Sequence, residues 1–127
     1  MANVQTKLSI VMSVYNGADY IKESVDSLLT QTIKDFEIII IDDGSTDDTA
    51  KILKSYNDPR IKLYNQANQG LVKSLNRGVG LATGKYIARQ DADDKSEPDR
   101  LERQLACLED NPEVVVVGSS IRVMDEK

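Results

Sequence analysis

Runs of apolar residues alternate along the chain with segments in which apolar residues recur at helical spacing. The runs that predict strands cover residues 8–14, 36–41, 61–64, 85–90 and 114–118. The first two are apolar at most positions, which is typical of strands covered on both faces, whereas 61–64 alternates between apolar and polar residues. We therefore predict five strands, the third of them near an edge of the sheet.

The segments between these strands show the spacing of amphipathic helices. Ser45 or Thr46 is predicted to cap the second helix, and Gly84 to end the third in a left-handed conformation. The apolar stripes that we expect to face the sheet are, in chain order, Ile21, Val25, Leu28 and Leu29; Ala50, Leu53 and Tyr56; Leu71, Leu75, Val79 and Ala82; and Leu101, Leu105 and Leu108.

The alternation of strands and helices predicts the fold class. Strands joined through helices form right-handed parallel crossovers, so the expected class is α/β, a mostly parallel, twisted sheet with helices on both faces. Residues 1–127 contain no internal repeat, low-complexity tract or linker and are expected to form a single domain.

The composition excludes several kinds of protein. No apolar run among the 127 residues is long enough to cross a membrane, and the first seven residues lack the pattern of a signal peptide, so we expect a cytoplasmic protein. The net charge of −5 argues against nucleic acid as a partner. Without histidine and with one cysteine, the chain has no Ser-His-Asp or Cys-His nucleophile and no internal disulfide.

Carboxylates follow two of the predicted strands. Asp42 and Asp43 come after residues 36–41, and an acidic group, Asp91-Ala92-Asp93-Asp94, comes after residues 85–90. Ligands of open α/β sheets bind beyond the carboxyl ends of the strands, near a switch in strand order. We therefore expect both acidic strand ends, together with Tyr15-Asn16, to face one crevice and to share one Mg²⁺ or Mn²⁺ site.

Other interpretations of the acidic strand ends remain open. A solvated acidic turn is the simplest. A receiver-like signalling domain also binds Mg²⁺ and takes a phosphoryl group on an aspartate, but it has acids at the end of its first strand, where this chain has Val14-Tyr15-Asn16. A pure interaction module would leave the acidic strand ends unexplained.

Six sequence blocks, taken in their order and spacing, resemble the amino-terminal half of family 2 glycosyltransferases, which have the GT-A fold. The blocks are residues 8–16, 27–32, 36–47, 76–78, 83–87 and 91–94. The resemblance covers nearly the whole chain. It implies a Rossmann-like nucleotide-binding half and a metal-assisted, inverting transfer of sugar from a nucleotide donor to an acceptor hydroxyl, in the synthesis of bacterial polysaccharides or glycolipids.

The resemblance also assigns roles to individual residues. It places Ser13 and Tyr15 against the uridine of a UDP-sugar and gives Asp43 a hydrogen bond from the uracil. It places Asp91 near the ribose and makes Asp93, together with Asp91, a ligand of the Mn²⁺ or Mg²⁺ that bridges the diphosphate. Further contacts with the nucleotide are implied for a later segment, at Lys73, Asn76 and Arg77.

The second half of the catalytic domain has no counterpart in these 127 residues. In the resembled family that half carries the general base and binds the acceptor, here a saccharide or lipid-linked saccharide. We therefore expect the chain alone to be inactive, Asp94 to belong to the metal loop rather than to act as base, and the uncovered face to favour a homodimer. The whole protein is expected in the cytoplasm or at the inner face of the membrane.

Overall fold

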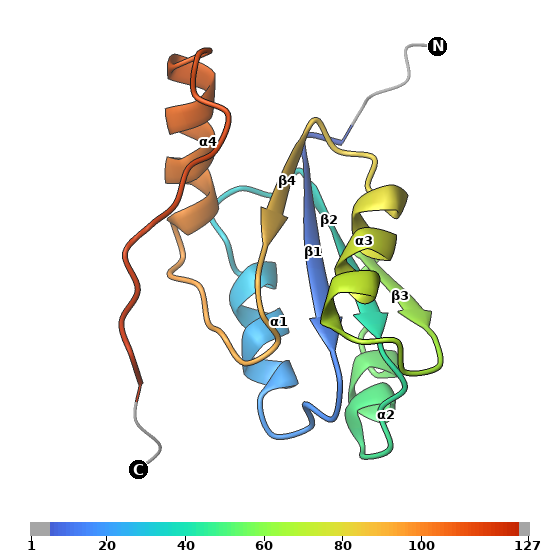
Figure 1. Ribbon diagram of the computed structural model, residues 1–127. Coiled ribbons are helices and arrows are strands. Elements are labelled where there is room, and N and C mark those ends of the chain that lie inside the picture. Colours follow the sequence, from blue (N-terminus) through green and yellow to red (C-terminus); the bar gives the residue numbers. More distant parts are fainter. Residues whose placement is uncertain (1–5, 125–127) are drawn as a thin grey trace.

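The computed structural model describes residues 6–124, in which strands and helices alternate strictly (Figure 1). The α/β class predicted from the sequence is confirmed. The strands are β1 (Leu8–Val14), β2 (Phe36–Asp42), β3 (Ile61–Asn65) and β4 (Tyr86–Arg89). The helices are α1 (Ile21–Leu29), α2 (Thr49–Lys54), α3 (Leu71–Leu81) and α4 (Arg100–Asp110).

The four described strands form one parallel sheet in the order β3-β2-β1-β4. β3 lies at an edge, as its alternating sequence predicted. From β1 the chain moves through β2 to β3, and it then returns to the other side of β1 to form β4. The strand order therefore switches between β1 and β4.

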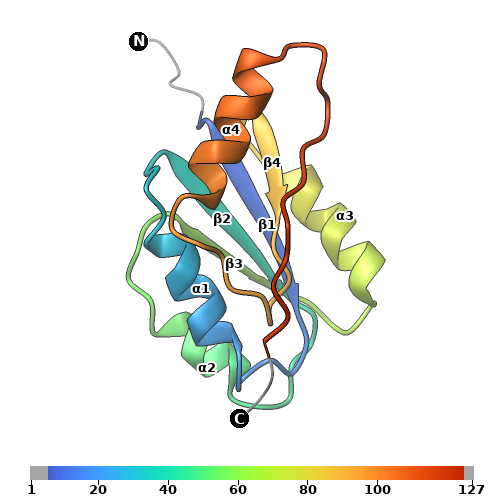
Figure 2. The same cartoon turned by 90° about the vertical axis from the view of Figure 1, so that its left-hand side faces the viewer.

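Helices cover both faces of the sheet (Figures 1 and 2). On one face, alternate residues of β1 and β2 pack against α1, α2 and α4 in an apolar core that includes Leu8, Ile10, Met12, Ile21, Val25, Leu28, Phe36, Ile38, Ile40, Leu53, Leu101 and Leu105. α3 packs on the other face, against β1 and β2. Full burial of each large aliphatic side chain contributes roughly 1.5–3 kcal/mol to folding, so this core fixes the positions of the strand ends.

The side of α3 that packs on the sheet is not the side predicted from its apolar residues. Leu71 and Val79 are 55% and 46% exposed, whereas Ser74 and Gly78 are buried. A Cβ atom at Gly78 would lie only 2.5 Å from Cγ1 of Val11, so the helix can approach β1 closely only because this residue is glycine. The prediction that Leu71 and Val79 face the sheet was wrong.

Two glycines of α3 provide a matched test of this packing. Gly78→Ala is expected to lower the free energy of unfolding by about 1–3 kcal/mol, because the added methyl group collides with Val11. Gly80→Ala is expected to raise it by roughly 0.4–1 kcal/mol, because no atom lies within 4 Å of a Cβ there and alanine restricts the unfolded chain. Urea unfolding of both variants measures the difference. Equal effects at the two positions would contradict the packing.

The fifth predicted strand is absent from the described structure. Residues 112–124 form neither strand nor helix, and Val115 and Val116 are 89% and 80% exposed. Figure 1 shows this segment running away from the end of α4 rather than joining the sheet. An apolar run becomes a strand only where a neighbouring strand takes its backbone hydrogen bonds, and no such partner lies beside it here.

The predicted helix signals at Ser45, Thr46 and Gly84 were also wrong. α2 begins only at Thr49, because Ser45 and Thr46 bind the loop that follows β1. α3 ends with Ala82 in an extended conformation, and Gly84 has no positive φ. A Cβ atom at Gly84 would lie 2.6 Å from the backbone nitrogen of Ser9, so glycine is required there for the close approach of β1.

None of the helices in the described part is long and apolar enough to cross a membrane. The interpretation of the first seven residues as lacking a signal peptide rests mainly on residues 1–5. These residues, and residues 125–127 at the other end, lie outside the part that the structure describes.

Candidate functional site

The loop after β1 is tied to the loop after β2 through Asn16. The Oδ1 atom of Asn16 accepts hydrogen bonds from the backbone nitrogens of Thr46, at 2.7 Å, and Asp47, at 3.3 Å. Its own backbone nitrogen donates to Oγ of Ser45 at 2.9 Å. Asn16 adopts a φ of 51°, in the left-handed region that asparagine tolerates better than most residues. Tyr15 is therefore held on a fixed backbone while its side chain stays 53% exposed.

Three carboxylates meet in the loop after β4, which we call the acidic loop (residues 91–97). Asp91, Asp93 and Asp94 each offer one oxygen atom, and these atoms lie within 4.8 Å of one another. Arg89 pairs with Asp91 at 3.1 Å, but both side chains are more than half exposed, so solvent weakens this ion pair. Partial burial and the charges of Asp91 and Asp93 raise the pKa of Asp94. The cluster thus retains repulsion that a cation would relieve.

The three oxygens fit a hard divalent cation. Ligands about 2.0–2.1 Å from Mg²⁺ lie at most roughly 4.2 Å apart when they are opposite one another, so oxygens within 4.8 Å need only small shifts to share one ion. Carboxylates are the ligands that Mg²⁺ and Mn²⁺ prefer. The sequence named Asp91 and Asp93 as ligands. The structure adds the carboxylate of Asp94, which the sequence had placed in the same loop without a ligand role.

A hollow of about 310 Å³ lies beside the acidic loop, at the switch in strand order. We call it the switch-point hollow. It brings together five of the residues that the sequence placed at the site: Ser13, Tyr15, Asn16, Asp91 and Asp93. The other lining residues are Val14, Gly17, Tyr20, Leu71 and Ala92. The sequence had assigned Leu71 to the core and Tyr20 to no role, and only their exposure in the fold reveals them.

Asp42 and Asp43 do not join the acidic cluster. Asp43 is 2% exposed, and its carboxylate accepts hydrogen bonds from Nε2 of Gln66 and from the backbone nitrogens of Gln69 and Gly70, at 2.8–2.9 Å. Burial alone would raise the pKa of Asp43, but these hydrogen bonds outweigh it and lower the pKa. Oδ1 of Asp42 accepts a bond from the backbone nitrogen of Ser45.

The expectation that both acidic strand ends share one cation was therefore wrong. Asp42 accepts a hydrogen bond from the loop that follows it, and Asp43 accepts hydrogen bonds from the loop after β3. Asp43 fixes the segment that leads into α3 and does not line the switch-point hollow. Its hydrogen bond to a uracil stays a prediction.

Lys73, Asn76 and Arg77 lie on the exposed side of α3 and are not among the residues that line the switch-point hollow. The guanidinium group of Arg77 lies 5.6 Å from the ring centre of Tyr64 and donates to Oε1 of Gln66 at 3.0 Å. Arg77 thus supports the segment held by Asp43. Contacts of these three residues with a nucleotide stay predictions.

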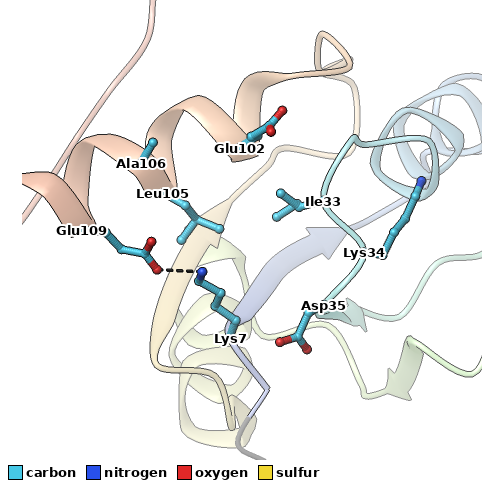
Figure 3. A pocket seen from close by; sticks show the side chains of 8 residues that line it. All are labelled: Lys7, Ile33, Lys34, Asp35, Glu102, Leu105, Ala106 and Glu109. Carbon is cyan, nitrogen blue, oxygen red and sulfur yellow. Dashed lines mark ion pairs between the residues drawn. The ribbon is translucent and has the colours of Figure 1, made fainter.

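A larger hollow, of about 500 Å³, lies at the opposite edge of the sheet, where β1 and β2 begin (Figure 3). Both positively and negatively charged side chains line it, and Nζ of Lys7 lies 2.8 Å from Oε1 of Glu109 across it. Lys7 and Glu109 thus neutralise each other. The switch-point hollow is smaller, but it adjoins a cluster of three carboxylates that forms one ion pair among the described residues, with Arg89, and it has the exposed aromatic ring of Tyr15. We therefore assign the functional site there.

Comparison with known families decides the classification. Residues 9–127 match the family described as Glycosyl transferase family 2. The chain belongs to this family. Among family 2 relatives, it is 46% identical over 128 residues to EpsE of Bacillus subtilis (strain 168), which is named as a glycosyltransferase. The match covers 98% of this chain and 46% of EpsE, so the chain spans less than half the length of that relative.

Solved structures share the fold. S. aureus TarS 1-349 in complex with UDP-GlcNAc superimposes with a TM-score of 0.79 and 30% sequence identity, covering 84% of this chain and 32% of TarS 1-349. Mannosyltransferase PcManGT from Pyrobaculum calidifontis, in complex with GDP-Man and Mn²⁺, has a TM-score of 0.75. The superposition covers 82% of this chain and 32% of PcManGT. The sequence identity is 24%, so this likeness concerns the fold alone. The resemblance to the amino-terminal half of GT-A glycosyltransferases is confirmed.

Proposed function

We propose that this chain binds a UDP-sugar through Mn²⁺ or Mg²⁺ and supports inverting transfer of the sugar to an acceptor hydroxyl, in the synthesis of a bacterial polysaccharide or glycolipid. One observation carries the proposal: the exposed ring of Tyr15 and the carboxylates of Asp91 and Asp93 line the same hollow at the switch in strand order. A planar base and an anionic diphosphate need these two kinds of contact side by side. The complex of TarS with UDP-GlcNAc supports a UDP-sugar as donor.

Each residue of the site has a distinct part in this proposal. Tyr15 offers its face to the base, and Ser13, on β1, offers a hydroxyl beside it. Asp93, with Asp91 and Asp94, would hold the cation. When bound, the cation acts as a Lewis acid that stabilises the charge developing on the departing nucleoside diphosphate. Without it, the carboxylates of Asp91 and Asp93, which line the hollow, would repel the donor.

The proposal treats the chain as a single nucleotide-sugar-binding domain. Inverting transfer needs a base to take the proton of the acceptor hydroxyl. Asp94 is held within the acidic cluster, so we assign the base and the acceptor site to a region that residues 1–127 do not contain. The chain's coverage of only 46% of EpsE supports this division. The acceptor in this proposal is a saccharide or a lipid-linked saccharide.

Calorimetric titration tests the proposal. UDP, GDP and ADP are titrated into the chain with and without Mn²⁺. We expect binding of UDP that requires Mn²⁺ and is weaker for the other two nucleotides. Equal binding of the three nucleotides, with no requirement for Mn²⁺, would refute the site. Phosphorylation of an aspartate by a small phosphodonor would instead indicate a receiver-like signalling domain.

We also propose that the chain forms homodimers through the exposed apolar side chains of α3. Val72 and Val79 are 71% and 46% exposed on this helix and do not line the switch-point hollow. Light scattering over a concentration series should show a mass that rises toward twice that of one chain. A constant monomer mass would refute the dimer.

A further inference from the structure

A buried glutamine lies directly behind the acidic loop. Gln90 follows the last residue of β4 and is 4% exposed. Its Nε2 atom donates to the Oγ and carbonyl oxygen of Ser24 on α1, at 2.8 and 3.1 Å. The same nitrogen donates to the carbonyl oxygen of Asp94 at 3.2 Å. One amide group therefore joins the acidic loop to a helix of the core.

The oxygen atom of the Gln90 amide binds residues that follow the three carboxylates. Oε1 accepts hydrogen bonds from Oγ of Ser96 and, at 3.3 Å, from a guanidinium nitrogen of Arg100. Arg100 also donates to Oγ of Ser96 at 3.0 Å and to the carbonyl oxygen of Arg89 at 2.9 Å. The acidic loop is thus tied both before and after its three carboxylates.

α1 provides two further contacts with the acidic loop. Oγ of Ser24 donates to the carbonyl oxygen of Asp91 at 3.3 Å, and Oγ of Ser27 accepts from the backbone nitrogen of Ser96 at 3.0 Å. Within the described residues, no buried side-chain nitrogen or oxygen lacks a hydrogen-bond partner. A fully satisfied polar network of this kind fixes one backbone conformation, because each alternative would leave a buried group unpaired.

The acidic loop needs such support because its carboxylates repel one another. Asp91, Asp93 and Asp94 are exposed and within 4.8 Å of each other, and in the absence of a cation they would gain by moving apart. The hydrogen bonds of Gln90 to Asp94 and Ser96 prevent the backbone of the loop from moving in a way that would separate the carboxylates. Mutation of groups that orient the ligands of a metal without touching it typically lowers metal affinity or activity by roughly 10–100-fold.

We infer that Gln90 is a positioning residue of the metal site: through Ser24, Asp94 and Ser96 it holds the three carboxylates ready for the cation, and it touches neither the cation nor the nucleotide. This inference rests on the proposed function, since it concerns the same site. It adds that the affinity for the metal is set partly by a neutral side chain in the core.

The test measures Mn²⁺ binding to the whole chain by electron paramagnetic resonance, together with amide hydrogen exchange without metal. Gln90→Met keeps the volume of the side chain but removes its hydrogen bonds. We expect Mn²⁺ affinity to fall roughly 10–100-fold. We also expect faster exchange at the amides of Asp94 and Ser96, which donate to Asp91 and Ser27 in the intact loop.

A variant at the opposite edge of the sheet controls for lost stability. Glu37 is 7% exposed and accepts bonds from Ser9 and Thr83, far from the acidic loop. Glu37→Gln is expected to lower the melting temperature while leaving Mn²⁺ affinity unchanged. Ser24→Ala, which removes one partner of Gln90, is expected to give an intermediate loss of affinity and serves if Gln90→Met does not fold.

The outcomes separate the inference from the proposed function. Wild-type affinity in both Gln90→Met and Ser24→Ala would overturn the inference alone, as would an equal loss of affinity in Glu37→Gln. Failure of the unaltered chain to bind Mn²⁺, with or without UDP, would overturn the proposed function and the inference together.

Discussion

Replacing Asp93 by alanine is expected to abolish the Mn²⁺-dependent binding of UDP. Asp93 belongs to the only group of three or more candidate ligands found among residues 6–124, and it also lines the switch-point hollow. Its removal leaves Asp91, which already pairs with Arg89, as the one carboxylate of the cluster that lines the hollow. The loss should exceed the roughly 10–100-fold typical of residues that only support a ligand. Titration calorimetry of UDP at saturating Mn²⁺ measures it.

Asp19→Ala provides the matched control for Asp93→Ala. Asp19 is exposed in the loop after β1, close in sequence to Tyr15, and it does not line the switch-point hollow. Both variants lose one negative charge, so a general electrostatic effect would act on both. Binding of UDP should stay unchanged in Asp19→Ala. Retention of metal-dependent binding in Asp93→Ala would remove Asp93 from the site.

Replacing Asp43 by asparagine is expected to lower the free energy of unfolding by about 3 kcal/mol at pH 7. The carboxylate is buried and accepts three hydrogen bonds, two of them from backbone nitrogens at the start of α3. Asparagine keeps one acceptor oxygen but places an amino group where Oδ2 accepted the bond of Gly70. Urea unfolding measures the loss, and Asp48→Asn, at an exposed position, is the control.

The effect of Asp43→Asn should depend on pH. The folded state lowers the pKa of Asp43 below its ordinary value of 3.8, so the ionised carboxylate stabilises the fold fully above that value. This contribution is lost as the pH falls through the lowered pKa. The difference in unfolding free energy between wild type and variant should therefore be constant near neutrality and shrink in the acid range. A difference that is unchanged down to pH 3 would contradict the role of the charge.

The fold class and the kinds of side chain at the candidate site could be predicted from the residues alone. Strands and helices follow from local periodicity, and the carboxylates of Asp91 and Asp93 lie next to each other because they share one short loop. Tyr15 meets them because β1 and β4 are parallel neighbours at the switch in strand order. The alternation of elements implied parallel strands and a crevice at such a switch, but not which strands flank it.

Which groups are available for a ligand depends on packing and hydrogen bonds between segments distant in sequence. Asp42 and Asp43 resemble the other acidic strand end in sequence, but Asp42 accepts a hydrogen bond from Ser45 in its own loop, and Asp43 accepts hydrogen bonds from the loop after β3. Gly78 rather than Leu71 faces the sheet, because the closeness of Val11 leaves no room for a side chain. The apolar residues after α4 match a buried strand in pattern but have no partner beside them. Periodicity records what a segment prefers by itself, whereas burial and hydrogen bonding depend on segments distant in sequence that the fold brings close.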